Sequence, residues 1–518
     1  MRIAAVDLGS NSFHLLVAEV RPDGAFESLI REKEMLRLGD VVSREGEITP
    51  EAADAAVRTM RRFRKLAEAA GAVEMLARAT SALRSAQNGD EVLDRIASEA
   101  GVEVDVIDGI DEARLIFLAI RAGVMIDPGP ALCLDVGGGS VELMVGDASG
   151  MLWAASERIG VARMSAQYVT SDPISKGDLR RLRDRYVDVL GPHAVTVARF
   201  EPKMAIGSSG TLEDLAHMVA ERRDEVVPRS LNQLTVSRPE FLALHEELVA
   251  STSAERRKMK GLDAKRVDLI VAGSVLLSVA MGLFDVEELT ISEWALREGI
   301  VLDAIGRHEP GDWSDDPRAI RRSSVMELAR RCSWPEQHSR HVATLALQLF
   351  DLTCEIHGLS DEDRELLEYA ALLHDIGEHV AHEDHDKHAA YLVSHGNLRG
   401  FPPDEVTLLA ALVRWHRRGD PKPSDELVGE LDADARDRVR KLVALLRIAD
   451  GLDRSRKQVV SEIAARVSPS MVLLRLAARS DPELELWGAR RKRQLFERVF
   501  DRELEVTAHP SGAGLHNV

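Results

Sequence analysis

The chain has 518 residues, of which 45% are hydrophobic and 30% charged, and its formal net charge is −19 at pH 7. This length exceeds what one hydrophobic core usually organises, and the composition excludes a chain that is disordered throughout. The acidic charge argues against non-specific nucleic-acid binding, although a local basic groove could still hold a polyanion. We therefore expect several folded domains and no nucleic-acid partner.

Localisation is predicted from three further features. The apolar run Ile3 to Val6 is too brief for the apolar core of a signal peptide, and the longest apolar stretch, Val271 to Leu283, is too short to span a bilayer. The three cysteines lie far apart, without the spacing of a zinc knuckle or a disulfide framework. These features predict a cytoplasmic protein with no membrane partner.

The first elements in the chain form a repeat. Asp7-Leu8-Gly9-Ser10-Asn11-Ser12 and Asp135-Val136-Gly137-Gly138-Gly139-Ser140 share the pattern Asp-x-Gly-x-x-Ser. An apolar strand is predicted before each motif and another after it (Phe13 to Val17; Val141 to Val145). Each copy is therefore interpreted as a strand, a tight turn of phosphate size and a second strand.

Between and after the two copies, strands and helices alternate. A helix is predicted from Thr49 to Ala70, a strand from Val73 to Ala77, a strand from Val102 to Ile107 and a helix from Glu112 to Ala122. Two further small-residue turns, Gly207 to Thr211 and Ala272 to Ser274, each follow an apolar run and are expected at strand ends. This alternation predicts an α/β sheet architecture.

The pattern changes after residue 305. The segment Gly306 to Pro317 has the composition of a linker, and the periodicity from residue 318 to 455 is almost wholly helical. Residues 456 to 518 are expected to form a small C-terminal α+β segment, with a strand at Met471 to Leu476 and a basic helix near Gly488 to Phe500. The predicted domains are thus 1–125, 126–305, 318–455 and 456–518.

Glycine-rich turns after an aspartate indicate phosphate chemistry. Successive backbone N–H groups in such turns can form a concave anion-binding nest, and glycine leaves it unobstructed. Asp7 and Asp135 are then candidate magnesium ligands, because Mg²⁺ usually takes one or two carboxylates together with substrate phosphates. Glu142 is a further candidate near the metal. The alternative is that both aspartates only cap turns.

At these motifs the sequence resembles the Ppx/GppA exopolyphosphatases. The resemblance covers roughly the first 305 residues and, more loosely, the helical domain after them. The segments that match in order are Val6 to Ser12, Ala79 to Arg84, Gly109 to Arg114, Asp135 to Ser140 and Ala295 to Gly299. The resemblance implies a duplicated actin-like, ribonuclease-H-like fold with the active site in a cleft between two halves, and phosphoryl transfer to water.

The resemblance also implies residue roles. Glu112 corresponds to the family's proposed general base, Asp135 to a residue that assists magnesium or the water, and Arg84 to a phosphate-contacting arginine. Without the family resemblance, Glu112 would be interpreted as an acid at a helix N-terminus and Arg84 as a surface arginine. The predicted phosphate-binding residues are Gly9, Ser10, Asn11, Ser12, Arg84, Gly137, Gly138, Gly139, Ser140, Ser208, Ser209, Gly210 and Thr211.

The helical domain carries a second candidate site. His374-Asp375 is the pair after which HD domains are named, with His338 upstream and Asp450 downstream. These mixed nitrogen and oxygen ligands suit Mn, Fe, Mg or Zn. His388 and His416 fall between the pair and Asp450, as the extra ligands of two-metal HD hydrolases do. The sequence is therefore compatible with a site for one metal ion or for two.

Several alternatives remain for this domain. It could be a relic that only extends a polyphosphate groove or holds a dimer together, and His341 could replace His338 because i and i+3 share a helix face. The cluster His379, His382 and His385 is interleaved with charged residues and is interpreted as a solvated loop. The basic run Arg490 to Arg493 could guide a polyanion, but a solvated helix face is the favoured interpretation.

The leading hypothesis is a magnesium-dependent exopolyphosphatase that releases orthophosphate from the end of inorganic polyphosphate. Hydrolysis of guanosine pentaphosphate is the alternative in the same fold. A different class of function is a polyphosphate or nucleotide sensor that controls an active HD phosphohydrolase. An ATPase or sugar-kinase function is disfavoured by the Glu-Ala-Arg motif at residue 112. A homodimer is expected from the resemblance alone.

Overall fold

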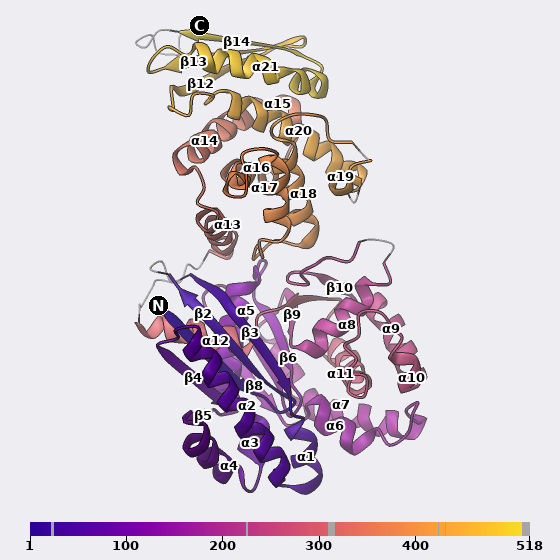
Figure 1. Ribbon diagram of the computed structural model, residues 1–518. Helices are drawn as coiled ribbons and strands as arrows, with labels where there is room; N and C mark the ends of the chain where they lie inside the picture. The colour runs from indigo at the N-terminus through magenta and orange to yellow at the C-terminus, as the bar shows by residue number, and fades with distance from the viewer. Residues whose placement is uncertain (22–24, 224–225, 309–315, 423, 430, 510–518) are drawn as a thin grey trace. The chain divides into compact units, whose positions relative to one another are not determined.

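The computed structural model describes residues 1–518 except 22–24, 224–225, 309–315, 423, 430 and 510–518 (Figure 1). The chain divides into two compact units, Met1–Ile320 and Arg321–Val518. The predicted linker from residue 306 to 317 lies largely outside the described residues, and helix α12 (Leu296–His308) includes its first three. In the described part of the chain, no helix has both the length and the apolar character needed to cross a bilayer.

The first unit contains two sheets that begin in the same way. The first has the strand order β3-β2-β1-β4-β5, and the second has the order β10-β11-β9-β6-β7-β8. In each, a glycine turn joins an antiparallel strand pair, and a parallel strand follows on the other side, as the sequence repeat predicts. The strands are β1 (Arg2–Leu8), β2 (Ser12–Val20), β3 (Phe26–Met35), β4 (Glu74–Ala79), β5 (Val104–Val106), β6 (Ala131–Val136), β7 (Val141–Gly146), β8 (Met151–Glu157), β9 (Met204–Ser208), β10 (Thr235–Ser237) and β11 (Glu288–Ser292).

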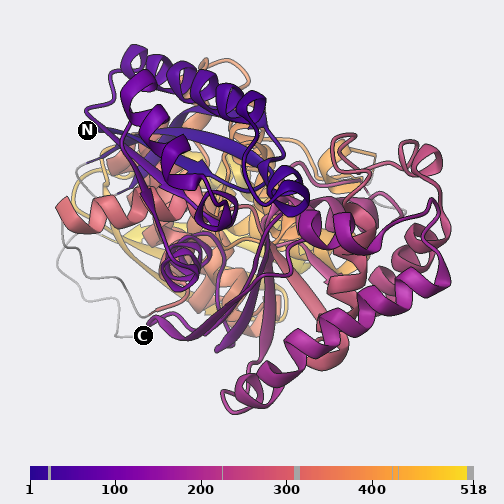
Figure 2. The same ribbon diagram turned by 90° about the horizontal axis from the view of Figure 1, so that it is seen from below.

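Helices cover both faces of the first sheet (Figures 1 and 2). Alternate residues of β1 point to opposite sides: Ala4 and Val6 join the apolar cluster that contains α2 (Pro50–Ala69), whereas Ile3 joins the cluster of α5 (Gly109–Gly123) and α12. Helix α12 follows the second sheet in sequence, yet it packs on β1 and β2 of the first. The two halves therefore share a core.

The other helices of this unit are divided between the two sheets. They are α1 (Leu38–Glu45), α3 (Ser81–Ser85), α4 (Gly89–Arg95), the π-helical turn Ile96–Ala100, α6 (Val161–Tyr168), α7 (Lys176–Ala198), α8 (Gly210–Ala220), α9 (Arg238–Ala250), α10 (Ser253–Arg256) and α11 (Ile270–Leu283). Of these, α1, α3, α4 and the π-helical turn pack with the first sheet, and the rest lie with the second. The expected turn at residues 272 to 274 is wrong, because these residues lie inside α11. A run that is apolar on every side fits a buried strand and a buried helix equally well, and here the helix is buried over nearly all of its length from Ile270 to Met281.

The second unit combines helices with a small sheet. Its helices are α13 (Ala319–Arg331), α14 (Glu336–Leu352), α15 (Cys354–His357), α16 (Asp361–Leu373), the 3₁₀ turn Ile376–His379, α17 (His385–Ser394), α18 (Pro403–Trp415), α19 (Glu426–Gly429) and α20 (Ala433–Gly451), followed by β12 (Val460–Val467), β13 (Met471–Ala478), α21 (Glu483–Phe500) and β14 (Glu503–His509). One apolar cluster extends from Val325 to Val506 and includes residues of both the helices and the sheet. The C-terminal segment therefore shares its core with the helical part.

A close helix crossing holds the first unit together. A methyl group at Gly299 of α12 would lie 2.0 Å from the carbonyl oxygen of Leu115 in α5. That oxygen belongs to a helix backbone and cannot move aside at low cost. We therefore expect Gly299→Ala to destabilise this unit by about 1–3 kcal/mol, measured as a shift in its urea unfolding transition.

Gly306→Ala, in the same helix, is the matched control. A methyl group there meets no heavy atom within 4 Å. Since alanine favours a helix over glycine, this variant should be neutral or up to ~1 kcal/mol more stable. Equal unfolding midpoints for the two variants would contradict the proposed close packing.

Candidate functional sites

A cleft in the first unit collects the glycine turns of both sheets. It encloses a cavity of about 240 Å³. The β1–β2 turn, the β6–β7 turn and the turn before α8 all contribute to its walls. The predicted phosphate-binding and metal-binding residues that line it are Asp7, Gly9, Ser10, Asn11, Ser12, Glu112, Asp135, Gly137, Gly138, Gly139, Ser140, Ser209, Gly210 and Thr211.

The two repeated turns face each other at close range. A methyl group at Gly138 would lie 3.2 Å from Cβ of Asn11, and one at Gly139 would lie 2.5 Å from Oγ of Ser10. Side chains at either position would push the two turns apart. Glycine is therefore needed here for close approach, in addition to leaving backbone N–H groups accessible to an anion.

Four carboxyl groups lie around these turns: Glu112, Asp135 and Glu142 are buried, and Asp7 is half-buried. Ser208 donates a 2.5 Å hydrogen bond to Asp135, Ser156 donates one of 2.8 Å to Glu142, and Arg84 lies 3.3 Å from Glu112. Oδ1 of Asp7 and Oε2 of Glu142 are buried without a hydrogen-bond partner. Three of the predicted site residues do not line the cavity: Arg84, Glu142 and Ser208. Arg84 and Ser208 instead contact the acids that do, Glu112 and Asp135.

Burial shifts the titration of these acids to higher pH. It raises the pKa of Asp7 to about 7, that of Asp135 to about 6 and that of Glu142 to about 8. Burial and the nearby Glu142 raise the pKa of Glu112 well above its usual value, while Arg84 opposes the shift. A divalent cation among these oxygens would stabilise the charged forms, so the donor set fits magnesium.

The cleft also contains basic side chains for which sequence reasoning gave no role. His14, Lys33, Arg266 and Arg297 all line it. Arg297 Nη1 donates to His14 Nδ1 at 2.9 Å, so His14 Nε2 carries the proton and donates to Ser12 Oγ at 2.7 Å. The Ser12 hydroxyl hydrogen is then free for another acceptor. Arg297 lies within the matched segment Ala295 to Gly299, which was its only signal in the sequence.

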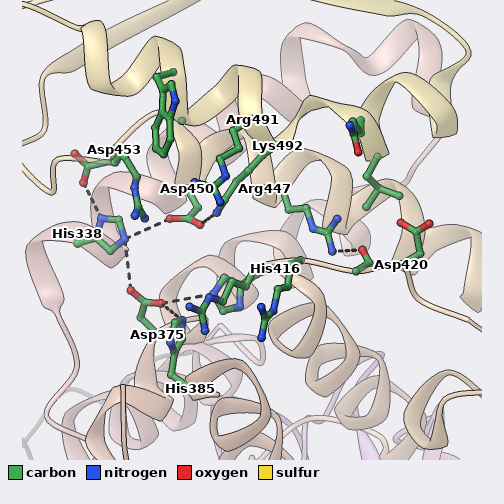
Figure 3. A pocket seen from close by; sticks show the side chains of 18 of the residues that line it. His338, Asp375, His385, His416, Asp420, Arg447, Asp450, Asp453, Arg491 and Lys492 are labelled. Carbon is green, nitrogen blue, oxygen red and sulfur yellow. Dashed lines mark hydrogen bonds and ion pairs between the residues drawn. The ribbon is translucent and has the colours of Figure 1, made fainter. Parts of the chain in front are cut away.

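The second unit has a cluster of histidines and aspartates (Figure 3). Nε2 of His338 lies 3.6 Å from Asp375 and 3.7 Å from Asp450, and Asp375 also lies 3.4 Å from His385 and 3.6 Å from His416. Among the described residues, three groups of potential ligands result: His338, His374 and Asp450; Asp375, His385 and His416; and, nearer the surface, Glu378, His382 and His385. Within each, the ligand atoms lie within 4.8 Å of one another.

The histidines share one orientation. Nδ1 of His374, His385 and His416 donates to the carbonyl oxygens of Ala371, His382 and Val413, respectively, and Nδ1 of His338 contacts Asp453 at 2.8 Å. A carbonyl can only accept, so these rings are protonated at Nδ1 and present the Nε2 lone pair. Metal-binding histidines are held in this way. Nε2 of His374 is buried without a partner.

Two cationic side chains lie against the two aspartates. Arg456 lies 2.6 Å from Asp375, and Lys492 of α21 contacts Asp450. Burial alone would raise the pKa of Asp450, but Lys492, His374 and His416 outweigh it and hold the pKa well below the usual value. Both carboxylates are therefore charged and available to a cation.

The structure corrects three histidine assignments. His385, interpreted as part of a solvated loop, is buried against Asp375, while the exposed His382 does fit that interpretation. His388 and His341 belong to none of the potential ligand groups among the described residues. His385 and His388 are one turn apart in α17, and only the orientation of that helix decides which faces Asp375. Asp453, two residues after Gly451, holds the ring of His338, and the sequence gave no prediction of this role.

Comparison with known proteins identifies the first unit. Residues 16–308 match the family model described as "Ppx/GppA phosphatase family", which is more than half of the chain. The chain belongs to the Ppx/GppA phosphatase family. Residues 320–480 match the model described as "Ppx/GppA phosphatase, domain III".

Named relatives of this Ppx/GppA protein include Exopolyphosphatase 1 of Mycobacterium leprae, 34% identical over 313 residues that cover 60% of this chain and 91% of the relative. Exopolyphosphatase 1 of Mycobacterium tuberculosis is 33% identical over 344 residues, which cover 66% of this chain and 98% of that protein.

The solved structures agree on the fold. The crystal structure of an exopolyphosphatase from Cytophaga hutchinsonii matches 60% of this chain and 100% of its own, with a TM-score of 0.56 and 32% identity. The Aquifex aeolicus family member covers 60% of this chain and 99% of its own, with a TM-score of 0.52 and 24% identity. The mixed α/β fold expected of an actin-like Ppx/GppA phosphatase is thereby confirmed for the first unit.

The buried carboxyl groups predict a pH-dependent stability of the cleft. The folded-state pKa values of Asp7, about 7, and Glu142, about 8, lie above the unfolded values near ~4. Protons that the folded state holds are lost on unfolding, so without metal the stability should fall as the pH rises from ~4 to ~8. The melting temperature in EDTA should show this fall, and magnesium should raise it more at pH 8 than at pH 6.

Glu142→Gln removes one of the carboxyl groups with a raised pKa, so the melting temperature in EDTA should depend less on pH than in the wild type. The exposed Glu246, changed to Gln, is the control. A wild-type slope in Glu142→Gln would contradict the shifted pKa of Glu142.

The histidine geometry predicts which residues retain metal in the second unit. After incubation with Mn²⁺ and dialysis, His385→Ala should retain less metal than wild type, by about tenfold in affinity or more, because a ligand is lost. His388→Ala, one turn along the same helix, should retain the wild-type amount. Mass-spectrometric metal analysis measures both, and equal losses would contradict the assignment of His385.

Proposed function

We propose that the cleft of the first unit is a magnesium-dependent exopolyphosphatase site, which releases orthophosphate from the end of inorganic polyphosphate. The observation that carries the proposal is the convergence of two facing glycine turns on three acids, of which Glu112 and Asp135 are buried and Asp7 is half-buried. Backbone N–H groups and hydroxyls can bind phosphate oxygens there. The names of the Mycobacterium and Cytophaga relatives support the same substrate.

The proposed reaction is the attack of water on the terminal phosphorus. Glu112 accepts a proton from the attacking water, a P–O bond forms, and the bond to the bridging oxygen breaks, which leaves a chain shorter by one phosphate. The raised pKa of Glu112 makes its ionised carboxylate a stronger base than an exposed one. Bound magnesium, held by Asp7 and Asp135 with Glu142 nearby, would neutralise charge on the phosphate oxygens.

The basic residues would orient the substrate. The His14 ring fixes the Ser12 hydroxyl through the contact from Arg297, and this leaves the hydroxyl hydrogen directed to an acceptor such as a phosphate oxygen. Lys33 and Arg266 extend positive charge along the cavity wall. A polyanion is therefore a better match than a neutral substrate.

We also propose that the second unit is an HD-type domain that binds one or two divalent ions, among Mn, Fe, Mg and Zn. The potential ligands are His338, His374, Asp375, His385, His416 and Asp450. Support comes from the four histidines, whose Nδ1 atoms are held by other groups, so that their Nε2 atoms and two charged carboxylates are gathered in one place. The homodimer expected from the family resemblance stays a prediction, which sedimentation analysis would test.

Glu112→Gln should lower phosphate release from long-chain polyphosphate by on the order of 10²- to 10⁴-fold, because it removes the base. Asp111→Asn is the control, since Asp111 precedes Glu112 in the same helix but is exposed. Assays with magnesium on polyphosphate and on guanosine pentaphosphate would also compare the two candidate substrates.

The double variant His374→Ala/Asp375→Ala separates the two units in the same assay. It should retain polyphosphate hydrolysis. Loss of this activity only in the double variant would instead make the first unit a sensor and the second unit the enzyme.

A further inference from the structure

The histidine cluster of the second unit opens into a large and positively charged pocket. Its volume is about 970 Å³, within the range of pockets that take small-molecule ligands. Nine arginines and lysines line it, against five acidic residues, although the whole chain carries a net charge of −19. Two of those acids, Asp375 and Asp450, belong to the potential metal ligands. The pocket therefore attracts anions against the overall charge of the protein.

The C-terminal helix forms one wall of this pocket (Figure 3). Helices α20 and α21 touch at two glycines: a methyl group at Gly488 would lie 2.3 Å from the carbonyl oxygen of Gly451. This contact is next to Asp450 and brings Lys492 of α21 onto that aspartate. Lys492 is therefore largely buried, which corrects its assignment to a solvated helix face.

The same helix contributes an aromatic surface. Trp487 lines the pocket although 47% of it is exposed, and the guanidinium carbon of Arg491 lies 5.1 Å from the centroid of its ring. An exposed indole contributes little to the binding of a bare inorganic anion. A planar ring, in contrast, stacks on tryptophan and on arginine.

The loop after α18 and the end of α20 supply further cations. Arg447 is largely buried, with its guanidinium held by the carbonyl oxygens of Trp415 and Gly419, and Arg456 bridges Asp375 and Glu378. Arg498 of α21 is fixed by Asp420 at 2.7 Å. Oriented guanidinium groups suit phosphate oxygens, because they donate two parallel hydrogen bonds.

We propose that this pocket is a second phosphohydrolase site, independent of the polyphosphate cleft, and that its substrate is a nucleoside phosphate. The phosphate to be cleaved lies at the histidine and aspartate cluster near Lys492 and Arg456, and the base stacks on Trp487. The proposal rests on metal binding by this unit, as proposed above.

The reaction needs no partner other than water. The water oxygen forms a new bond to phosphorus, the bond from phosphorus to the ester or anhydride oxygen breaks, and a water proton passes to that leaving oxygen. Metal ions bound by these residues would activate the water and neutralise the phosphate. Lys492 and Arg456 already contact the two metal-facing carboxylates and are near enough to share a phosphate bound there.

The test uses the full chain carrying Glu112→Gln, so that the first cleft is silent, after loading with Mn²⁺. ATP, GTP and AMP are compared with inorganic tripolyphosphate, which has the same phosphates as ATP but no ring. Phosphate release is measured by a colorimetric assay with product analysis, and binding by calorimetry. We expect nucleotide hydrolysis that His374→Ala/Asp375→Ala abolishes.

Variants of α21 test whether the indole ring of Trp487 binds the base of the nucleotide. Trp487→Ala should weaken nucleotide binding by about tenfold or more and leave tripolyphosphate unaffected. Leu484→Ala is the matched control, since Leu484 is also exposed one turn earlier in α21 but does not line the pocket. Lys492→Ala should weaken binding of every phosphate-bearing probe, because it removes a charge that all of them share.

Three results would overturn the inference. Mn²⁺-loaded protein that neither binds nor hydrolyses any of the nucleotides would refute it while the metal centre stands. Equal sensitivity of ATP and tripolyphosphate to Trp487→Ala would refute the nucleoside as the recognised part. Protein that binds no metal would refute both this inference and the proposed metal centre, and would leave the exopolyphosphatase proposal untouched.

Discussion

Buried polar atoms that lack a hydrogen-bond partner are the constraint on which both sites depend. In the first unit, Asp7 and Glu142 each have a carboxylate oxygen with no hydrogen-bond partner, and in the second unit the same holds for Nε2 of His374. Leaving such atoms unpaired inside a protein costs free energy. A fold that retains them has donor atoms ready for a cation, and the surrounding elements hold those atoms in position.

The two units meet this constraint with different chemistry. The cleft of the first unit offers oxygen donors and backbone N–H groups, which suit a hard ion and a phosphate chain. The second unit offers imidazole nitrogens and carboxylates, which suit transition metals as well. Their surroundings differ accordingly. The cleft is narrow and lined by glycine turns, whereas the second pocket is wide, basic and bounded on one side by the aromatic ring of Trp487.

In both units, close backbone contacts between glycines and neighbouring elements fix the geometry. Gly138 and Gly139 allow the two repeated turns to face each other, and Gly299 lets α12 pack on α5 across the two halves. Gly451 and Gly488 do the same for α20 and α21, and so bring a basic helix against Asp450. Site residues far apart in sequence therefore depend on backbones that no side chain separates.

Local patterns were enough to predict the repeat of aspartate and glycine turns, the alternating elements of the first unit and the His-Asp pair of the second, because each has a fixed period or spacing. The sequence could not decide between strand and helix at Ile270 to Leu283, where every side is apolar and periodicity carries no information. Nor could it choose His385 over His388, find Asp453, or join Lys492 and Trp487 to the histidine cluster. These features follow from the packing of the folded chain, because the direction of a side chain depends on how its helix is rotated against helices distant in sequence.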